Sequence, residues 1–157
     1  MEISDEKFEN LKKDAESLYK SFGDILCPYL GEKLTFNAQG LEHVKFRGRN
    51  RARNRDDQYI RLRYLKLAPE VIKRSHTVQG VSAVNKMERL RTNSRWDFIM
   101  CRVRYHEFVA VIEEVRVRII IKSINESPYY FWSIIPFWRM DKDVKKRLMH
   151  NGNPEED

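Results

Sequence analysis

The chain of 157 residues carries 30 Lys and Arg against 23 Asp and Glu, a formal net charge of +7, and 41% of its residues are hydrophobic. This composition suffices for one domain-sized core, and five Pro with six Gly exclude a collagen-like or linker-like chain. Residues 33–106 are net +12, whereas residues 1–32 are net −4 and residues 107–157 net −1, so a polyanion is the expected partner of the middle of the chain.

The amino-terminal segment predicts an amphipathic helix over residues 5–22. Ser4 is a suitable N-cap, and apolar residues then recur at spacings of three and four as far as Phe22, before Gly23 ends the pattern. The segment is acidic and lacks the apolar core of a signal peptide, and no apolar run in the chain approaches the ~18 residues that span a bilayer. We therefore expect a cytoplasmic protein with no membrane partner.

A short helix and an arginine-rich segment follow. Asn37 can cap a helix over residues 38–46, with Leu41 and Val44 facing inward. Residues 47–55 read RGRNRARNR, which predicts a loop because Gly and Asn discourage regular structure. A guanidinium can bind a phosphate through two parallel hydrogen bonds and stack on bases. The candidate nucleic-acid-binding residues are therefore Arg47, Arg49, Arg51, Arg53 and Arg55, and the alternative is a solvated surface loop.

A third helix is predicted to begin at Asp56 and Asp57, with Ile60, Tyr64 and Leu67 on its buried stripe. Pro69 interrupts this pattern, and residues 70–75 predict a further helical turn.

The period then changes from helical to two-residue. Over residues 99–121 the odd positions are mostly apolar, which predicts half-buried strands with breaks near residues 106–107 and 113–114. Residues 77–85 and 129–136 predict a first and a last strand. Helices followed by antiparallel strands indicate an α+β domain.

The even positions of these strands predict one cationic face. They include Arg102, Arg104, Arg116, Arg118 and Lys122, which would suit the dianionic phosphorane formed when an RNA 2′-hydroxyl attacks its phosphate. In the last strand, strict alternation places Tyr130, Trp132 and Ile134 on one face and Phe131, Ser133 and Ile135 on the other. One set should belong to the core, and the other set either packs there too or stacks on unpaired bases.

His43 is the candidate proton-transfer residue, because it precedes the arginines and an imidazole titrates near neutrality; the alternative is a structural helix histidine. A metal site is poorly supported, because no carboxylate group is expected to converge on Mg²⁺, and Cys27 and Cys101 lack a zinc-site spacing. We therefore expect no cofactor and two buried cysteines.

Three segments within residues 33–138 are informative together: LTFNAQGLEHVKFRGRNR, DDQYIRLRYLKLAPEVIKRS and IIIKSINESPYYFWSIIPFW. They resemble the phage- and mobile-element-associated branch of the barnase–EndoU–colicin–RelE nuclease superfamily. The resemblance implies helices followed by a four-stranded antiparallel sheet, as in barnase and RelE. It implies a metal-independent endoribonuclease, often a toxin or mobile-element effector. The catalytic residues it implies are His43, Arg61, Lys122 and Ser133, and no glutamate base is evident.

Residues 33–138 would then form the nuclease-like core, residues 1–32 an amino-terminal helix with its connector, and residues 139–157 a polar, partly disordered segment. Two other functions fit the same sequence. One is a non-catalytic module that binds RNA or DNA, and the other is an interaction domain for an acidic partner such as an antitoxin or immunity protein.

Overall fold

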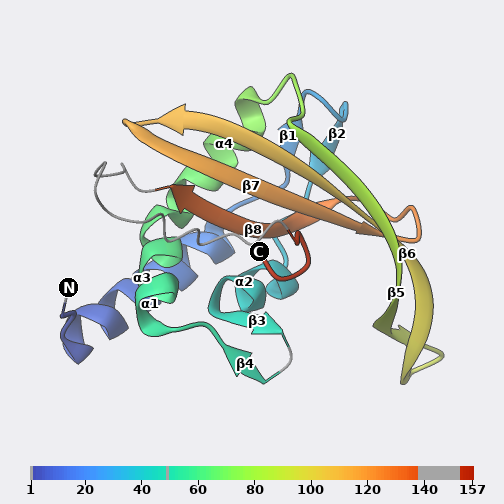
Figure 1. The fold of residues 1–157 in the computed structure, drawn as a ribbon, viewed down its shortest axis with the longest axis horizontal. Helices are drawn as coiled ribbons and strands as arrows, with labels where there is room; N and C mark the ends of the chain where they lie inside the picture. Colours follow the sequence, from blue (N-terminus) through green and yellow to red (C-terminus); the bar gives the residue numbers. More distant parts are fainter. Residues whose placement is uncertain (1, 49, 138–152) are drawn as a thin grey trace.

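The computed structural model describes residues 2–48, 50–137 and 153–157. Its helices precede its main sheet along the chain, which confirms the predicted α+β class (Figure 1). The first part contains α1 (Asp5–Ser21), β1 (Ile25–Cys27), β2 (Glu32–Leu34), α2 (Ala38–Lys45), β3 (Phe46–Gly48), β4 (Arg51–Ala52), α3 (Arg55–Tyr64), the 3-10 turn η1 (Leu65–Leu67) and α4 (Ala68–Arg74). The sheet contains β5 (Gly80–Thr92), β6 (Arg95–Ile112), β7 (Val115–Ile124) and β8 (Tyr130–Phe137).

Local capping fixes where the helices begin. The side chains of Ser4 and Asn37 accept amide hydrogen bonds from the first turns of α1 and α2, as predicted. The cap of α3 is Asn54, whose Oδ1 accepts the amide of Asp57 at 2.8 Å, so α3 begins one residue before the predicted Asp56. The predicted loop over residues 47–55 is wrong in part, because β3 and β4 pair as a small antiparallel hairpin. Asn50 adopts a φ of 60° there, a conformation that Asn tolerates better than most residues.

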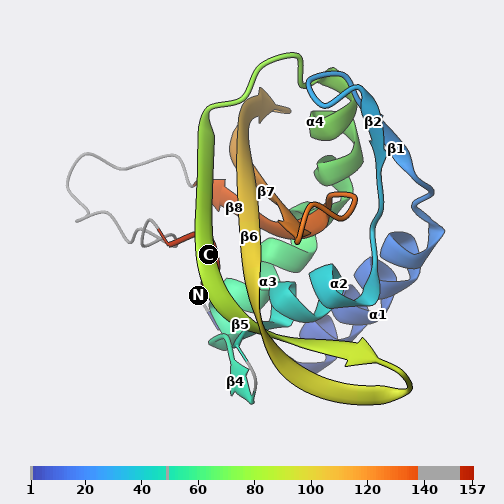
Figure 2. The ribbon, with the colours of Figure 1, turned by 90° about the vertical axis from the view of Figure 1, so that its right-hand side faces the viewer.

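The four long strands pair in chain order as an antiparallel sheet, β5-β6-β7-β8. The predicted break at residues 113–114 is confirmed, since Glu113 and Glu114 form the turn between β6 and β7 with φ values of 50° and 63°. The predicted break near residues 106–107 is wrong, because β6 is continuous. The buried positions of β6 are instead odd-numbered as far as Tyr105 and then shift to the even-numbered Phe108. Figure 2 shows the far half of the β5–β6 hairpin curving beneath α2.

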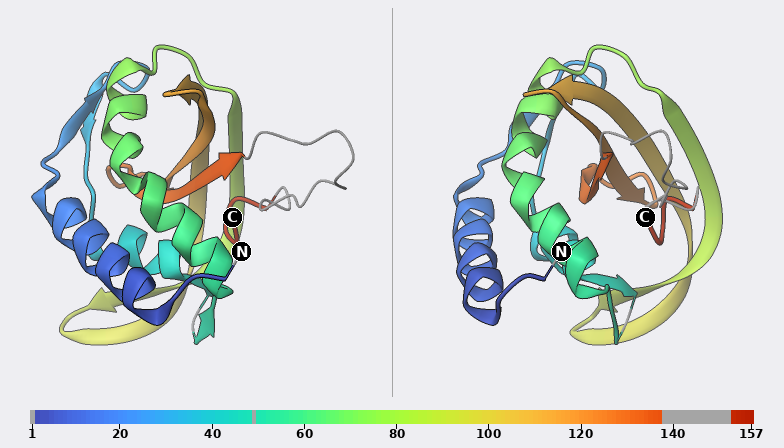
Figure 3. Two further views of the ribbon diagram at one scale, coloured as in Figure 1. Left: turned by 90° about the vertical axis from the view of Figure 1, so that its left-hand side faces the viewer. Right: turned by 60° about the vertical axis from the view of Figure 1, so that its left-hand side comes forward.

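The larger hydrophobic core lies between the sheet and the helices. Figures 1 and 3 show α3 and α4 following one another along the sheet, with α1 alongside. Helix α2 packs so closely on β8 that a Cβ added to Gly40 would lie 2.2 Å from the backbone oxygen of Phe131. Leu41 and Val44 of α2 are buried in this core, as predicted. Among the described residues, no helix is both long and apolar enough to cross a membrane.

A β-bulge in β8 overturns the predicted alternation of the last strand. Ser133 pairs with Ile120 and Phe131 with Ile121, so Trp132 is the extra residue between them. One extra residue exchanges the two faces of a strand beyond it. Phe131 and Ile134 therefore share the core beneath the helices, whereas Trp132 and Ile135 join a second, smaller cluster.

The second cluster lies on the opposite side of the sheet from the helices. Its buried members are Cys101, Val103, Tyr105, Ile120 and Ile135. Both cysteines are buried as predicted, Cys27 in the larger core and Cys101 in this cluster.

The chain was predicted to divide into residues 1–32, 33–138 and 139–157, and the described parts of all three belong to one folded structure. The larger core takes residues from both 1–32 and 33–138, including Tyr19 and Ile119. Of the predicted carboxyl-terminal segment, residues 139–152 lie outside the described part of the structure. Residues 153–157 lie beside β8 (Figure 1), where Pro154 accepts a hydrogen bond from Trp132, and Asp157 is buried.

Candidate functional site

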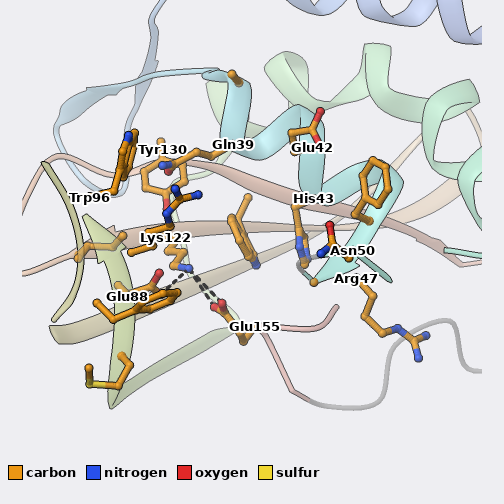
Figure 4. A pocket seen from close by; sticks show the side chains of 18 residues that line it. Gln39, Glu42, His43, Arg47, Asn50, Glu88, Trp96, Lys122, Tyr130 and Glu155 are labelled. Carbon is orange, nitrogen blue, oxygen red and sulfur yellow. Dashed lines mark hydrogen bonds and ion pairs between the residues drawn. The ribbon is translucent and has the colours of Figure 1, made fainter. Parts of the chain in front are cut away.

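A cavity of about 610 Å³ lies between α2, the hairpin β5–β6 and the strands β7 and β8 (Figure 4). Helix α2 contributes Gln39, Glu42 and His43, and the segment after it contributes Arg47. The sheet side is lined by Met87, Glu88, Arg89, Trp96, Phe98, Lys122, Tyr130 and Trp132. The cavity thus combines aromatic rings with three cationic side chains, Arg47, Arg89 and Lys122, and three carboxylates, Glu42, Glu88 and Glu155.

Trp132, the bulge residue, is held between two of the predicted catalytic side chains. The imidazole of His43 stacks on its indole with ring centres 4.0 Å apart and planes 16° apart. The Lys122 ammonium lies 3.9 Å from the centre of the same ring. A stacked ring fills the face that it covers, so His43 and Lys122 occupy opposite faces of the indole.

His43 is buried, with 4% of its surface exposed, and is neutral in this arrangement. Its Nε2 lies 3.1 Å from Nη2 of Arg53, and Arg53 also donates from Nε to the His43 carbonyl oxygen at 3.0 Å. A guanidinium can only donate, so Nε2 accepts and the ring proton resides on Nδ1. Burial and the nearby charges of Arg53, Arg61 and Lys122 lower the pKa of His43 to about 2.

Lys122 is buried, whereas its even position predicted an exposed cationic face. Its Nζ lies 2.9 Å from Oε1 of Glu88 and 3.0 Å from Oε2 of Glu155, two ion pairs that Figure 4 shows. Lys86 contacts the same two carboxylates. Burial lowers the pKa of Lys122 to about 8 and raises that of Glu155 to about 7, because desolvation disfavours both charged forms.

Arg61 and Ser133 are brought together, but behind the cavity and away from solvent. Nη1 of Arg61 donates to the Ser133 hydroxyl at 2.8 Å, and its Nε donates to Asp57 at 2.6 Å. Asp57 also faces Nη1 of Arg53 at 3.5 Å. The predicted buried stripe of the third helix is wrong at Ile60 and Tyr64, which are only partly buried. Helix α3 instead buries Tyr59, Leu62 and the ion pair of Asp57 and Arg61.

The arginines of residues 47–55 separate in the structure. Arg47 lines the cavity, and Arg53 is buried against His43. Arg51 is exposed on β4, and Arg55 lies against α1, where its Nη1 is 2.6 Å from Asp5. Arg49 lies outside the described residues. The arginines of this one segment therefore lie partly at the cavity and partly on surfaces away from it.

Several residues of the site were not predicted from the sequence. Glu88 of β5, Trp96 of β6 and Glu155 of the carboxyl-terminal residues line the cavity, and Lys86 of β5 lies behind it, paired with Glu88 and Glu155. The two-residue spacing of Lys86 and Glu88 places them on one face of β5, but only the pairing of distant strands brings them beside Lys122. Trp96 and Phe98 are more than half exposed, which is unusual for large apolar side chains.

Within residues 2–48, 50–137 and 153–157, no three His, Cys, Asp or Glu side chains gather to hold a metal ion. No known family model, curated protein or solved structure matches the chain.

Proposed function

We propose that the protein is a cytoplasmic, metal-independent endoribonuclease of the phage- and mobile-element-associated branch named above, acting as a toxin or mobile-element effector. The observation that carries this proposal is the convergence of His43, Arg47, Glu88 and Lys122 on one cavity with exposed aromatic rings. Cations there would bind the RNA phosphates, and Trp96 and Phe98 offer faces on which unpaired bases can stack.

In the proposed reaction, the RNA 2′-hydroxyl oxygen attacks the adjacent phosphorus and the bond to the 5′-oxygen breaks. The products are a 2′,3′-cyclic phosphate and a free 5′-hydroxyl. Lys122 would stabilise the dianionic phosphorane, because an ammonium in a desolvated site interacts strongly with developing negative charge. Glu88, next to Lys122, is the carboxylate available to accept the 2′-hydroxyl proton.

His43 would transfer the second proton, to the 5′-oxygen, once RNA is bound. The positive charges around His43 hold its pKa low, and a bound phosphate would offset them and raise it. Arg53 would have to leave Nε2 and turn toward the phosphate for this step.

The test is incubation of the purified protein with mixed RNA in excess EDTA, followed by mapping of the fragment ends. We expect cleavage with cyclic phosphate ends, and about a 100-fold lower rate for Lys122→Gln. Lys73→Gln, an exposed residue of α4, is the matched control and should cleave at the parent rate. Intact RNA under these conditions would contradict the proposal, and a His43→Ala variant with the parent rate would remove His43 from it.

A second candidate is RNA or DNA binding without cleavage. It is favoured by the state of His43, whose Nε2 is occupied by Arg53 and whose low pKa leaves it a weak base. Protection of RNA from an added ribonuclease, without turnover, would favour this candidate.

A further inference from the structure

Residues 153–157, Asn-Pro-Glu-Glu-Asp, lie against Lys122, which lines the cavity, and against Lys86 beside it. The Glu155 carboxylate forms ion pairs with Lys86 and Lys122, and Figure 4 shows it pointing toward the Lys122 ammonium. The indole N–H of Trp132 donates to the carbonyl oxygen of Pro154 at 3.1 Å. An acidic piece of the same chain thus contacts residues of the proposed site.

A second set of donors converges on one backbone oxygen. The backbone oxygen of Asp157 accepts from Nη1 of Arg61, from Oγ of Ser133 at 2.6 Å and from Nη2 of Arg53 at 3.2 Å. Two guanidinium groups and a hydroxyl around one oxygen are the donors that bind phosphate oxygens in proteins. Arg61 and Ser133 are both fully buried, and Asp157 contacts each of them.

The charges of this region indicate an anionic ligand. Four cations, Lys86, Lys122, Arg53 and Arg61, are paired with two carboxylates of the folded framework, Glu88 and Asp57. Within the described residues, the acidic segment 153–157 adds the Glu155 carboxylate as a further counter-charge to Lys86 and Lys122. A neutral or cationic ligand in place of this segment would remove that counter-charge from the buried Lys122 ammonium.

We propose that Lys86 with Lys122, and Arg53 with Arg61 and Ser133, form two phosphate subsites for single-stranded RNA, which residues 153–157 occupy as an internal competitor. This inference rests on the proposed function and gives it a regulation: the acidic segment must leave before RNA enters. The Glu155 carboxylate stands where one phosphate binds, and the Asp157 backbone oxygen stands where an oxygen of another phosphate binds.

The test is the affinity for a fluorescein-labelled, single-stranded 2′-O-methyl oligonucleotide, measured by anisotropy at fixed salt. This probe has no free 2′-hydroxyl to act as nucleophile, so binding is measured without cleavage. We expect removal of residues 153–157 to tighten binding about tenfold, because a competing anion is lost. Unchanged or weaker binding by the folded, shortened chain would overturn the inference.

Substitutions within the shortened chain locate the subsites. Lys86→Gln and Arg53→Gln should each weaken oligonucleotide binding about fivefold, whereas exposed Lys73→Gln should leave it within about twofold. Equal effects of all three variants would mean that the oligonucleotide binds elsewhere, which contradicts the assignment.

A variant of the full chain guards against a shortened chain that does not fold, as judged by circular dichroism. Glu155→Gln removes one ion-pairing charge and should tighten binding about threefold, and Glu9→Gln on the exposed side of α1 is its matched control. If the shortened chain is unfolded, equal affinities of these two variants refute the inference. Tighter binding without RNA cleavage would support the two phosphate subsites and refute the ribonuclease proposal. Cleavage of RNA with unchanged binding would support the ribonuclease proposal and refute the subsites.

Discussion

The two faces of the sheet β5–β8 bury their side chains by different physical means. Beneath the helices, the described core cluster consists of apolar and aromatic residues, such as Phe108, Ile119 and Phe131. On the other face a small apolar cluster adjoins buried Lys122, and at the last strand, β8, helices α2 and α3 add His43 and Arg61, with Arg53 beside His43. Apolar burial is non-directional, whereas each buried charge needs a partner in the correct place.

This difference separates stability from binding within one small domain. Buried ion pairs contribute little net stability compared with apolar residues of the same volume, so the charged face is an inefficient way to hold a fold together. It is well suited to holding an anion, because its donors are already desolvated and oriented. We therefore assign stability to the helix-covered face and ligand binding to the charged face.

The largest effect is expected from removing one buried carboxylate, which tests whether the buried charges need their partners. Asp57→Asn takes away the counter-charge shared by Arg53 and Arg61, and we expect the free energy of unfolding to fall by about 3–5 kcal/mol. Urea denaturation followed by circular dichroism measures it. Asp56→Asn, exposed in the same helical turn, should cost no more than about 1 kcal/mol. Similar losses in the two variants would show that the buried charges behave like surface ones.

The close packing of the helix-covered face is tested at Gly40. Ala normally stabilises a helix relative to Gly by about 1 kcal/mol, but here its Cβ would meet the backbone of β8. We expect Gly40→Ala to lower the free energy of unfolding toward the upper end of ~1–3 kcal/mol. Gly23→Ala, whose Cβ meets no atom within 4 Å, is the control for the same denaturation experiment. A neutral Gly40→Ala would mean that α2 can move away from β8.

The pH dependence of stability probes the charged face. His43 has a pKa of about 2 when folded against an ordinary 6.5, so the unfolded chain binds one more proton between these values. Stability contributed by the neutral ring is therefore present above pH 6.5 and falls by up to ~1.4 kcal/mol per unit as the pH drops below it. Between pH 6 and 5, His43→Gln should show a shallower fall in urea midpoints than the parent. Parallel curves would place His43 in a more solvated environment.

The starts of the helices and the class of the fold were open to prediction because their causes are local. Ser4 and Asn37 cap helices through amides only a few residues away. The turn at residues 113–114 separates two runs of alternating residues, and the order of helices and strands follows from the change of period. These features involve neighbours in sequence, so the sequence alone determined them.

The site was predicted only in part, because its members are selected by partners far away in the chain. His43 and Lys122 were identified as candidates, but nothing local to them revealed that Trp132 would lie between them. The bulge that places Trp132 there arises from the pairing of β7 with β8, and no alternation pattern encodes it. Likewise, Glu88 of β5 belongs to the site only because folding brings it beside Lys122 of β7.

Sequence by itself determined that the middle of the chain is basic, where α1 and α2 begin, and that helices precede the strands of the main sheet. Tertiary structure alone decided which charges are buried. An arginine is buried only where carboxylate or carbonyl oxygens accept hydrogen bonds from its guanidinium and offset the cost of desolvation. Arg53 and Arg55 illustrate the reason: two residues apart in one basic segment, the first is enclosed beside His43 and the second faces α1. Desolvation depends on what packs around a group, and that is a property of the fold.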